Sequence, residues 1–286
     1  METTELVNGI NSKNYETIRV TAEAGVARVT IDNPPVNVLG VKLITELKGF
    51  LADVAIDKSV KVIVFDSANP DFFIAHVDMT LQLEDVGELA KAVPEGLNPF
   101  QALSETLRNQ PQVTIVKLSG IARGGGAEFV AAADMSFAAI GHGKLAQCEA
   151  LMGIVPGGGA TQYLEMKMGR SRALEVILGA DLIDATTAER YGWINRAIPV
   201  EEIDAFVDTL AHNIAALPDG VISAAKYAIP AKNLSEGFKR ENDAWLGLVT
   251  LPAAAKLIGG GVAKGLQTKE GELQLEDILR GQLGTV

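Results

Sequence analysis

The sequence has 286 residues, 48% of them hydrophobic, and a formal net charge of -11. A chain of this size can bury a large core, as one large domain or two small ones. The acidic balance argues against a nucleic-acid or anionic-membrane partner, because both are polyanions. The one cysteine, Cys148, cannot form an internal disulfide, so we expect a cytoplasmic protein.

Targeting and membrane segments are not evident in the sequence. Residues 1–15 have neither a basic start followed by an apolar stretch nor an arginine-rich amphipathic pattern. The most apolar stretches, such as residues 113–118, are much shorter than the ~20 residues that span a bilayer. We therefore predict neither a targeting peptide nor a membrane partner.

The first two hundred residues alternate between strand and helix signals. Apolar Ala27, Val29 and Ile31 alternate with polar residues, which is typical of a strand, while residues 41–56 place apolar side chains at helical spacing. The expected strands lie in the hairpin at residues 18–32 and at 60–65, 113–118 and 134–140, and the expected helices at 41–56, 100–108, 127–133, 160–168, 171–178, 185–191 and 200–217. This alternation predicts an α/β fold.

Beyond Pro218 the strand signals stop. Helical patterns cover residues 221–228 and 235–248, and we expect a break at the three glycines 259–261, followed by a polar tail. The change in pattern predicts a core domain over residues 1–217 and a helical region over residues 218–286.

A glycine run, Gly124, Gly125 and Gly126, separates a predicted buried strand from a predicted helix that begins near Glu128. Such a run leaves unpaired N–H groups at the helix start, which suit an anionic oxygen. Its spacing does not fit a nucleotide-phosphate loop, and tight turns alone are the simpler reading of an isolated run. The apolar residues after Glu128 place this carboxylate at the edge of a buried region.

A second glycine-rich turn, residues 153–159, follows Glu149. Glu149 has weaker support from its surroundings, because 36 acidic residues make any chosen pair a candidate for solvated surface. His76 lies in a turn, where a polar histidine without a catalytic role is the simpler reading. Cys148 has no histidine near it in sequence, so it reads as a small buried hydrophobe. The three histidines lack the spacing of a metal site, and we predict no metal.

Several of these motifs occur together in one order. The GGG-x-E run ends at Glu128, Q-C-E ends at Glu149, and G-I-V-P-G-G-G-A-T-Q and A-E-R-Y-G-W-I-N follow at residues 153–162 and 188–195. With them, residues 18–216 resemble the crotonase superfamily, the enoyl-CoA hydratase/isomerase family. The resemblance implies a crotonase-like spiral of ββα repeats with C-terminal helices that build homotrimers, commonly paired into hexamers, and help to close the active site.

The resemblance also implies an acyl-CoA thioester substrate and no added cofactor. Two backbone N–H groups would hold the thioester oxygen, and by position these belong to Val77 and Gly125. The family's turn usually resembles A-G-A-D, whereas this chain has histidine in place of the glycine. The remaining residues expected at the substrate are Ala75, His76, Asp78, Gly124, Gly126 and Gly157.

Family hydratases place two glutamates around one water, and Glu128 and Glu149 match those positions. The resemblance implies that Glu128 deprotonates the water that attacks Cβ, while Glu149 supplies the proton to Cα. Two carboxylates favour hydration over isomerisation, for which one often suffices. Isomerisation, thioester hydrolysis and carbon–carbon cleavage remain alternatives, which His76 and Cys148 would make plausible. A non-catalytic acyl-CoA-binding relative is a further one.

Overall fold

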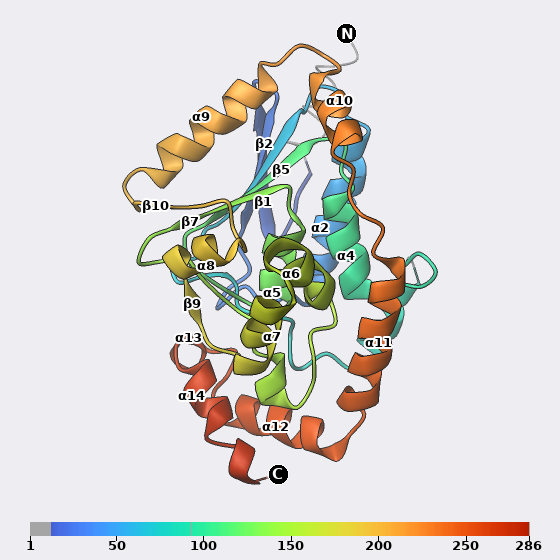
Figure 1. Ribbon diagram of the computed structural model, residues 1–286, viewed down its shortest axis with the longest axis vertical. Coiled ribbons are helices and arrows are strands. Elements are labelled where there is room, and N and C mark those ends of the chain that lie inside the picture. Colours follow the sequence, from blue (N-terminus) through green and yellow to red (C-terminus); the bar gives the residue numbers. More distant parts are fainter. Residues whose placement is uncertain (1–12, 92, 286) are drawn as a thin grey trace.

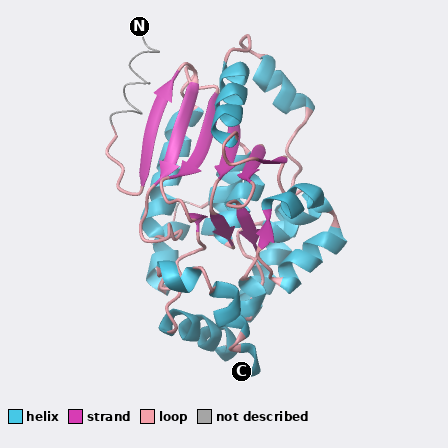
Figure 2. Ribbon diagram, turned by 90° about the vertical axis from the view of Figure 1, so that its left-hand side faces the viewer, coloured by secondary structure: helices cyan, strands magenta, loops and turns pink. Residues whose placement is uncertain are grey.

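A computed structural model describes residues 13–91 and 93–285 of the chain. The prediction that residues 1–15 carry no targeting peptide falls mainly on residues outside this part. The described chain is a mixed α/β structure with two sheets, and strand β1 of the larger sheet begins at Ile18 (Figures 1 and 2).

Ten strands form these two sheets. The larger sheet has the order β1-β2-β3-β5-β7-β10; its strands are β1 (Ile18–Glu23), β2 (Val26–Ile31), β3 (Val62–Ser67), β5 (Val113–Leu118), β7 (Met135–Ala139) and β10 (Arg196–Ile198). The smaller sheet has the order β4-β6-β8-β9; its strands are β4 (Phe72–Ile74), β6 (Ile121–Arg123), β8 (Lys144–Ala146) and β9 (Ile183–Asp184). The first two strands form the predicted antiparallel hairpin, and β2, β3, β5, β7 and β10 run parallel.

The chain repeats one unit as it builds these sheets. In the pairs β3/β4, β5/β6 and β7/β8, the first strand joins the larger sheet and the second joins the smaller one before the chain turns into helix. This is the ββα spiral that the sequence predicts, and the prediction of fold class is confirmed. The repeat brings the loops after successive strands of the smaller sheet to one region of the molecule.

Helices cover the larger sheet on both faces. The helices of the core are α2 (Val41–Ala55), α3 (Leu83–Ala90), α4 (Pro99–Arg108), α5 (Gly125–Ala132), the 3₁₀ helix η1 (Glu149–Met152), α6 (Ala160–Met168), α7 (Arg170–Gly179), α8 (Ala185–Tyr191) and α9 (Ile203–Ala215). Along β3, Ile63 and Phe65 pack in one cluster with α2 and α4, whereas Val62 and Val64 pack in another with α9. Successive residues of β3 thus face opposite helix layers. Figure 1 shows α9 on one side of the larger sheet and α2 and α4 on the other.

The C-terminal region contains helices up to Thr285, and the predicted break at glycines 259–261 is wrong. It contains α10 (Val221–Ala228), α11 (Ser235–Val249), α12 (Pro252–Ala263), α13 (Lys269–Glu272), α14 (Leu275–Arg280) and the 3₁₀ helix η2 (Leu283–Thr285). Helix α12 continues through the glycines, and two of them lie against neighbours: a Cβ on Gly261 would lie 2.7 Å from Leu266 Cδ1 and 3.1 Å from Leu279 Cδ2, and one on Gly260 would overlap Gln282 Oε1. Gly260 and Gly261 thus allow close packing and do not end the helix.

Helices α12 and α14 contact η1, so the C-terminal region packs onto the segment that carries Glu149 (Figure 1). The boundary between residues 217 and 218 stays a prediction. Among the described residues, no single helix is long and apolar enough to cross a membrane. Helices α11 and α12, which bend by 77° at their junction, pass that test together by length and composition only.

Candidate active site

The N-terminus of α5 is the centre of the candidate site. Gly124 precedes the helix with φ of +48°, a conformation that side chains other than glycine rarely adopt. The N–H of Gly125, the first residue of α5, has no acceptor within the helix. The helix then buries the side chains that follow, including Phe129 and Val130, because it runs between the sheet and α6. A free N–H therefore sits at the edge of a buried region, as the glycine run predicts.

The turn after β4 lies beside this helix start. Two of its backbone groups pair with Leu39: Leu39 N–H donates to the His76 carbonyl at 2.8 Å, and Asp78 N–H donates to the Leu39 carbonyl at 3.2 Å. The Val77 N–H donates to no group in the described part of the chain. A Cβ on Gly125 would lie 3.8 Å from the Val77 nitrogen, so the two predicted donors are neighbours. Their action on a thioester oxygen stays a prediction.

Glu128 is held by the second glycine-rich turn. Its Oε1 accepts hydrogen bonds from the N–H of Gly158 at 2.7 Å and of Ala160 at 3.0 Å. A Cβ on Gly158 would overlap Glu128 Oε2, so this close approach requires glycine. Burial raises the pKa of Glu128 well above its usual range, and the charges of Glu149 and Glu241 raise it further, whereas the two N–H donors oppose the shift.

Glu149 begins η1 and points toward the same glycine run. A Cβ on Gly124 would lie 2.8 Å from Glu149 Oε1. The amide nitrogen of Gln147 lies 3.2 Å and 3.1 Å from the two Glu149 carboxyl oxygens when the amide is oriented to donate. Burial raises the pKa of Glu149 to about 8, and the charge of Glu241 adds to the shift. The structure therefore brings together two buried carboxyl groups from separate loops.

Comparison with known proteins agrees with this arrangement. The family model for enoyl-CoA hydratase/isomerase matches residues 21–243. The chain belongs to the enoyl-CoA hydratase/isomerase family. This membership confirms the resemblance that the sequence motifs indicate, and the crotonase-fold relatives support a hydratase-like enzyme of the hydro-lyase type.

Three relatives illustrate the range of similarity. A Streptomyces avermitilis protein, provisionally named an enoyl-CoA hydratase, has a crystal structure with a TM-score of 0.93 and 58% identity, covering 94% of this chain and 98% of that one. A Rhizobium meliloti protein with the same provisional name is 28% identical over 80% of this chain and 88% of its own length. Human mitochondrial methylglutaconyl-CoA hydratase is 32% identical over 57% of this chain, but the match spans only 47% of the human protein.

A third buried carboxylate, Glu241 of α11, was missed by the sequence reasoning. It accepts hydrogen bonds from Thr161 N–H and from Gln101 Nε2, each at 3.0 Å, and burial raises its pKa. Phe238, Glu241 and Trp245 share one face of α11, and Phe238 is buried. This helical spacing, which places a glutamate among apolar side chains, is the signal that could have identified it. A C-terminal helix of this enoyl-CoA hydratase/isomerase family member thus brings a third buried carboxylate close enough to Glu128 for its charge to act on it.

The other predicted substrate residues lie around this centre. Ala75 is buried, and its N–H donates to the Val36 carbonyl at 3.2 Å, whereas Asp78 accepts from Thr80 N–H at 2.8 Å. A Cβ on Gly157 would lie 2.9 Å from Trp245 Cδ1. For Gly126, a Cβ would overlap the Ile74 carbonyl oxygen at the end of β4. These close approaches explain the glycines structurally, and direct contacts with substrate stay predictions.

His76 is not a solvated turn residue. It is 2% exposed, and its two ring nitrogens lie 2.8 Å from Glu272 Oε1 and 2.7 Å from the Val77 carbonyl oxygen. Sequence reasoning did not predict this partner, because Glu272 lies 196 residues further along the chain. Cys148 is fully buried, as predicted, and burial raises the pKa of its thiol well above the usual value.

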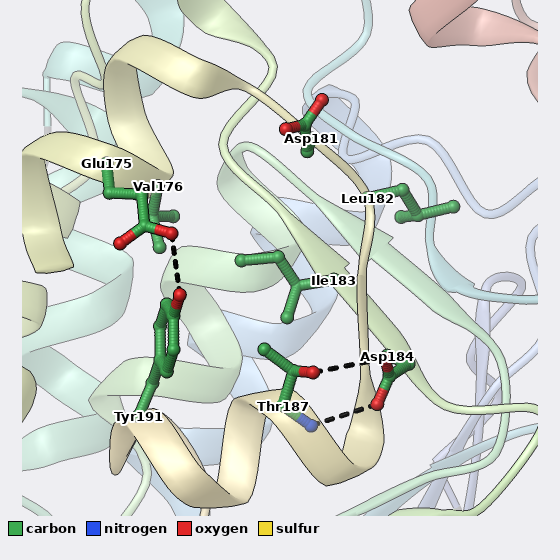
Figure 3. A pocket seen from close by; sticks show the side chains of 8 residues that line it. All are labelled: Glu175, Val176, Asp181, Leu182, Ile183, Asp184, Thr187 and Tyr191. Carbon is green, nitrogen blue, oxygen red and sulfur yellow. Dashed lines mark hydrogen bonds between the residues drawn. The ribbon is translucent and has the colours of Figure 1, made fainter.

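Two surface cavities lie away from these residues. The smaller, of about 230 Å³, lies between α7 and α8 and is lined by Glu175, Asp181 and Asp184 together with apolar side chains (Figure 3). Its carboxylates are paired within the protein: Tyr191 donates to Glu175 at 2.6 Å, and Thr187 N–H to Asp184 at 2.9 Å. The larger, of about 610 Å³, lies at the C-terminal end of α5. Among the described residues, no group of three or more His, Cys, Asp or Glu could hold a metal ion.

The raised pKa of Glu149 predicts a change in stability with pH. A carboxyl group whose pKa rises to about 8 on folding stabilises the fold below its unfolded value and loses this contribution as the pH rises through 8. Glu149→Gln removes the buried charge, so the variant should be more stable than wild type at pH 9, by on the order of 1–3 kcal/mol. At pH 5 the difference should nearly vanish. Urea unfolding at both pH values measures it.

The matched control for this prediction is Glu23→Gln, which changes an exposed glutamate on β1. Its free energy of unfolding should equal that of wild type at both pH values. A Glu149→Gln variant that is no more stable than wild type at pH 9 would contradict the predicted cost of the buried charge.

Proposed function

We propose that the protein reversibly adds water across the 2,3 double bond of a 2-enoyl-CoA thioester and releases a 3-hydroxyacyl-CoA. The observation that carries this proposal is the pair of buried carboxyl groups, Glu128 and Glu149, beside the neighbouring N–H groups of Val77 and Gly125. Family membership supports the substrate class, and the two carboxyl groups supply the base and the acid that hydration requires.

The charge states of the pair suit these two roles. Burial raises the pKa of both groups, and the charge of Glu149 raises that of Glu128 further, so the pair holds a proton near neutral pH. The N–H groups of Gly158 and Ala160 stabilise a negative charge on Glu128. Glu149, whose pKa lies near 8, then keeps the proton. The hydrogen bonds thus favour Glu128 as base and Glu149 as acid.

The proposed reaction proceeds through an enolate. Val77 and Gly125 donate hydrogen bonds to the thioester oxygen, which draws electrons from Cβ. Glu128 removes a proton from a water molecule while the oxygen of this water forms a bond to Cβ. The electron pair of the double bond then moves toward the thioester oxygen, which produces an enolate. Glu149 then gives its proton to Cα. Return of one proton from Glu128 to Glu149 restores the starting state.

The alternative reactions were plausible because of His76 and Cys148, and the surroundings of both residues argue against them. Both ring nitrogens of His76 are engaged with protein oxygens, and Cys148 is fully buried with a raised thiol pKa. Neither therefore offers a free nucleophile or base for thioester hydrolysis or carbon–carbon cleavage. A non-catalytic acyl-CoA-binding role gives no reason to bury two carboxyl groups at such a cost.

Incubation with enoyl-CoA esters of several chain lengths tests the proposal. We expect the absorbance of crotonyl-CoA to fall and mass spectrometry to show addition of one water with CoA still attached. An isomerase would leave the mass unchanged, a hydrolase would release free CoA, and a lyase would shorten the acyl chain. If no enoyl-CoA in the panel gains water, the proposed reaction is wrong.

We further propose a homotrimer, or a hexamer built from two trimers. Large apolar side chains are exposed on and after α10, where Tyr227 is 88% exposed and Ile229 is 81% exposed, and on the helices that follow, which supports burial of this region between copies of the chain. Light scattering measures the assembly mass, and a stable monomer would contradict it.

Two remaining features are proposed on the same basis. The reaction sequence above uses only side chains, backbone N–H groups and water, so we propose that it needs no cofactor beyond the CoA of the substrate, and no metal. The single cysteine supports a cytoplasmic location. Activity of dialysed, chelator-treated protein and fractionation of cells test these two points.

A further inference from the structure

A buried charge network links the turn at residues 75–78 to the C-terminal helices. Arg123 and Glu272 are fully buried, and His76 is 2% exposed. His76 Nε2 lies 2.8 Å from Glu272 Oε1, and Arg123 Nη1 lies 3.5 Å from Glu272 Oε2. Arg123 also donates from Nε and Nη2 to both carboxylate oxygens of Glu276, at 2.7 Å and 2.9 Å.

The network contains two carboxylates, a guanidinium and an imidazole. Both ring nitrogens of His76 lie within hydrogen-bond distance of an oxygen, one of the Val77 carbonyl and one of the Glu272 carboxylate. Arg123 supplies a positive charge between the carboxylates of Glu272 and Glu276. Burial by itself would raise the pKa of Glu272, but the hydrogen bond and charge of His76 lower it below the usual value. Removing one member would therefore leave an unpaired buried charge.

Glu272 is connected to both ends of the turn that presents the Val77 N–H. On one side it pairs with His76, whose ring also bonds the Val77 carbonyl. On the other, Glu272 Oε1 accepts from Gln267 N–H at 2.8 Å, and Gln267 Oε1 accepts from Met79 N–H at 2.6 Å. Residues 76 and 79 enclose Val77, so one carboxylate from α13 fixes the turn on both sides.

We propose that Glu272 is a positioning residue that sets the direction of the Val77 N–H toward the thioester oxygen. The proposal rests on the proposed function for the identity of that oxygen. The family's turn usually has a small glycine where this chain has His76, and a histidine there needs a partner that glycine does not. Helix α13 supplies the partner, so the C-terminal region takes part in forming the oxyanion site.

The strength of the hydrogen bonds to a bound thioester tests this proposal directly. Polarisation of the carbonyl lowers its infrared stretching frequency, and carbon-13 at the carbonyl of butyryl-CoA isolates that band. Butyryl-CoA has no double bond to hydrate, so the measurement does not depend on turnover. In Glu272→Gln we expect the frequency to move back toward that of free butyryl-CoA. The kcat for enoyl-CoA hydration should fall about tenfold, less than the 10²–10³ loss of removing one donor outright.

The matched control is Glu276→Gln. It removes a carboxylate from the same network, but Glu276 pairs with Arg123 and, among the described residues, makes no hydrogen bond to the turn. It should lower the melting temperature while leaving the carbonyl frequency and kcat near wild type. Glu272→Asp keeps the negative charge on a side chain that is shorter by one methylene, so this variant should fold. Its carbonyl frequency should shift in the same direction as in Glu272→Gln, but by less.

The results separate the two proposals. Unchanged carbonyl frequency in both Glu272 variants, or an equal change in Glu276→Gln, would overturn the positioning role even if wild type hydrates enoyl-CoA. A wild-type protein that hydrates no enoyl-CoA, but whose bound butyryl-CoA responds to Glu272→Gln, would contradict only the proposed reaction.

Discussion

Replacing Glu128 with glutamine should lower kcat for enoyl-CoA hydration by about 10²- to 10⁴-fold, the usual loss on removing a general base. The side chain keeps its shape, and its remaining oxygen can still accept from Gly158 and Ala160 N–H. Binding of butyryl-CoA should therefore change little, whereas the attacking water loses the group that deprotonates it. Steady-state kinetics with crotonyl-CoA and calorimetry with butyryl-CoA measure the two effects.

The comparison variant is Glu241→Gln, which removes a neighbouring buried charge from a residue that holds Thr161 and Gln101. Because the charge of Glu241 raises the pKa values of Glu128 and Glu149, its removal should lower both. In wild type, activity should fall above about pH 8 as Glu149 loses the proton that it must donate. In Glu241→Gln this alkaline limb should move to lower pH, with a much smaller loss of kcat at the optimum.

Two results would count against the assigned roles. Glu128→Gln that retains more than a tenth of wild-type kcat would show that another group activates the water. An alkaline limb that persists unchanged in Glu149→Gln would show that a different group donates the proton to Cα.

Local patterns predicted much of this fold because they are set by neighbouring residues. The strand at residues 113–118 and the helices at 160–168, 185–191 and 221–228 have the predicted bounds, since turn residues such as Gly159 and Gly192 flank continuous apolar patterns. The break predicted at glycines 259–261 is wrong because the role of Gly261 depends on Leu266 and Leu279, and that of Gly260 on Gln282, all of which pack against α12 from later in the chain.

The residues of the candidate site also differ in whether their local sequence could identify them. Glu128 could be found from its own segment, since a glycine run and an apolar helix flank it, whereas Glu149 needed the family resemblance. Glu241 shares a helix face with apolar side chains, which is a local signal of burial, but only the folded chain brings it to Thr161. Glu272 lies in a charged segment whose sequence resembles exposed surface, and only the folded chain brings it to His76. Contacts between distant segments carry no local signal, so burial of a charged residue is the property that sequence reasoning predicts least well.

Gly126→Ala should damage both the packing of α5 and the candidate site. The added Cβ would overlap the Ile74 carbonyl oxygen and lie 2.8 Å from Ile74 Cβ, so α5 and the end of β4 must move apart. Overpacking of this kind costs about 1–3 kcal/mol of unfolding free energy. It also separates the Val77 and Gly125 N–H groups, and a misplacement of about 1 Å can lower the rate by about 100-fold. Urea unfolding and kcat/KM measure both losses.

Gly49→Ala provides the control, because Gly49 lies within α2 and a Cβ there has no neighbour within 4 Å. Alanine has the higher helix propensity, so this variant should be more stable than wild type by about 0.5–1 kcal/mol, with unchanged kcat/KM. Gly126→Ala also exchanges glycine for the residue of higher helix propensity. A loss of stability in that variant is therefore caused by the contact with Ile74. Wild-type stability and activity in Gly126→Ala would mean that the close packing of α5 on β4 does not hold the two N–H groups in place.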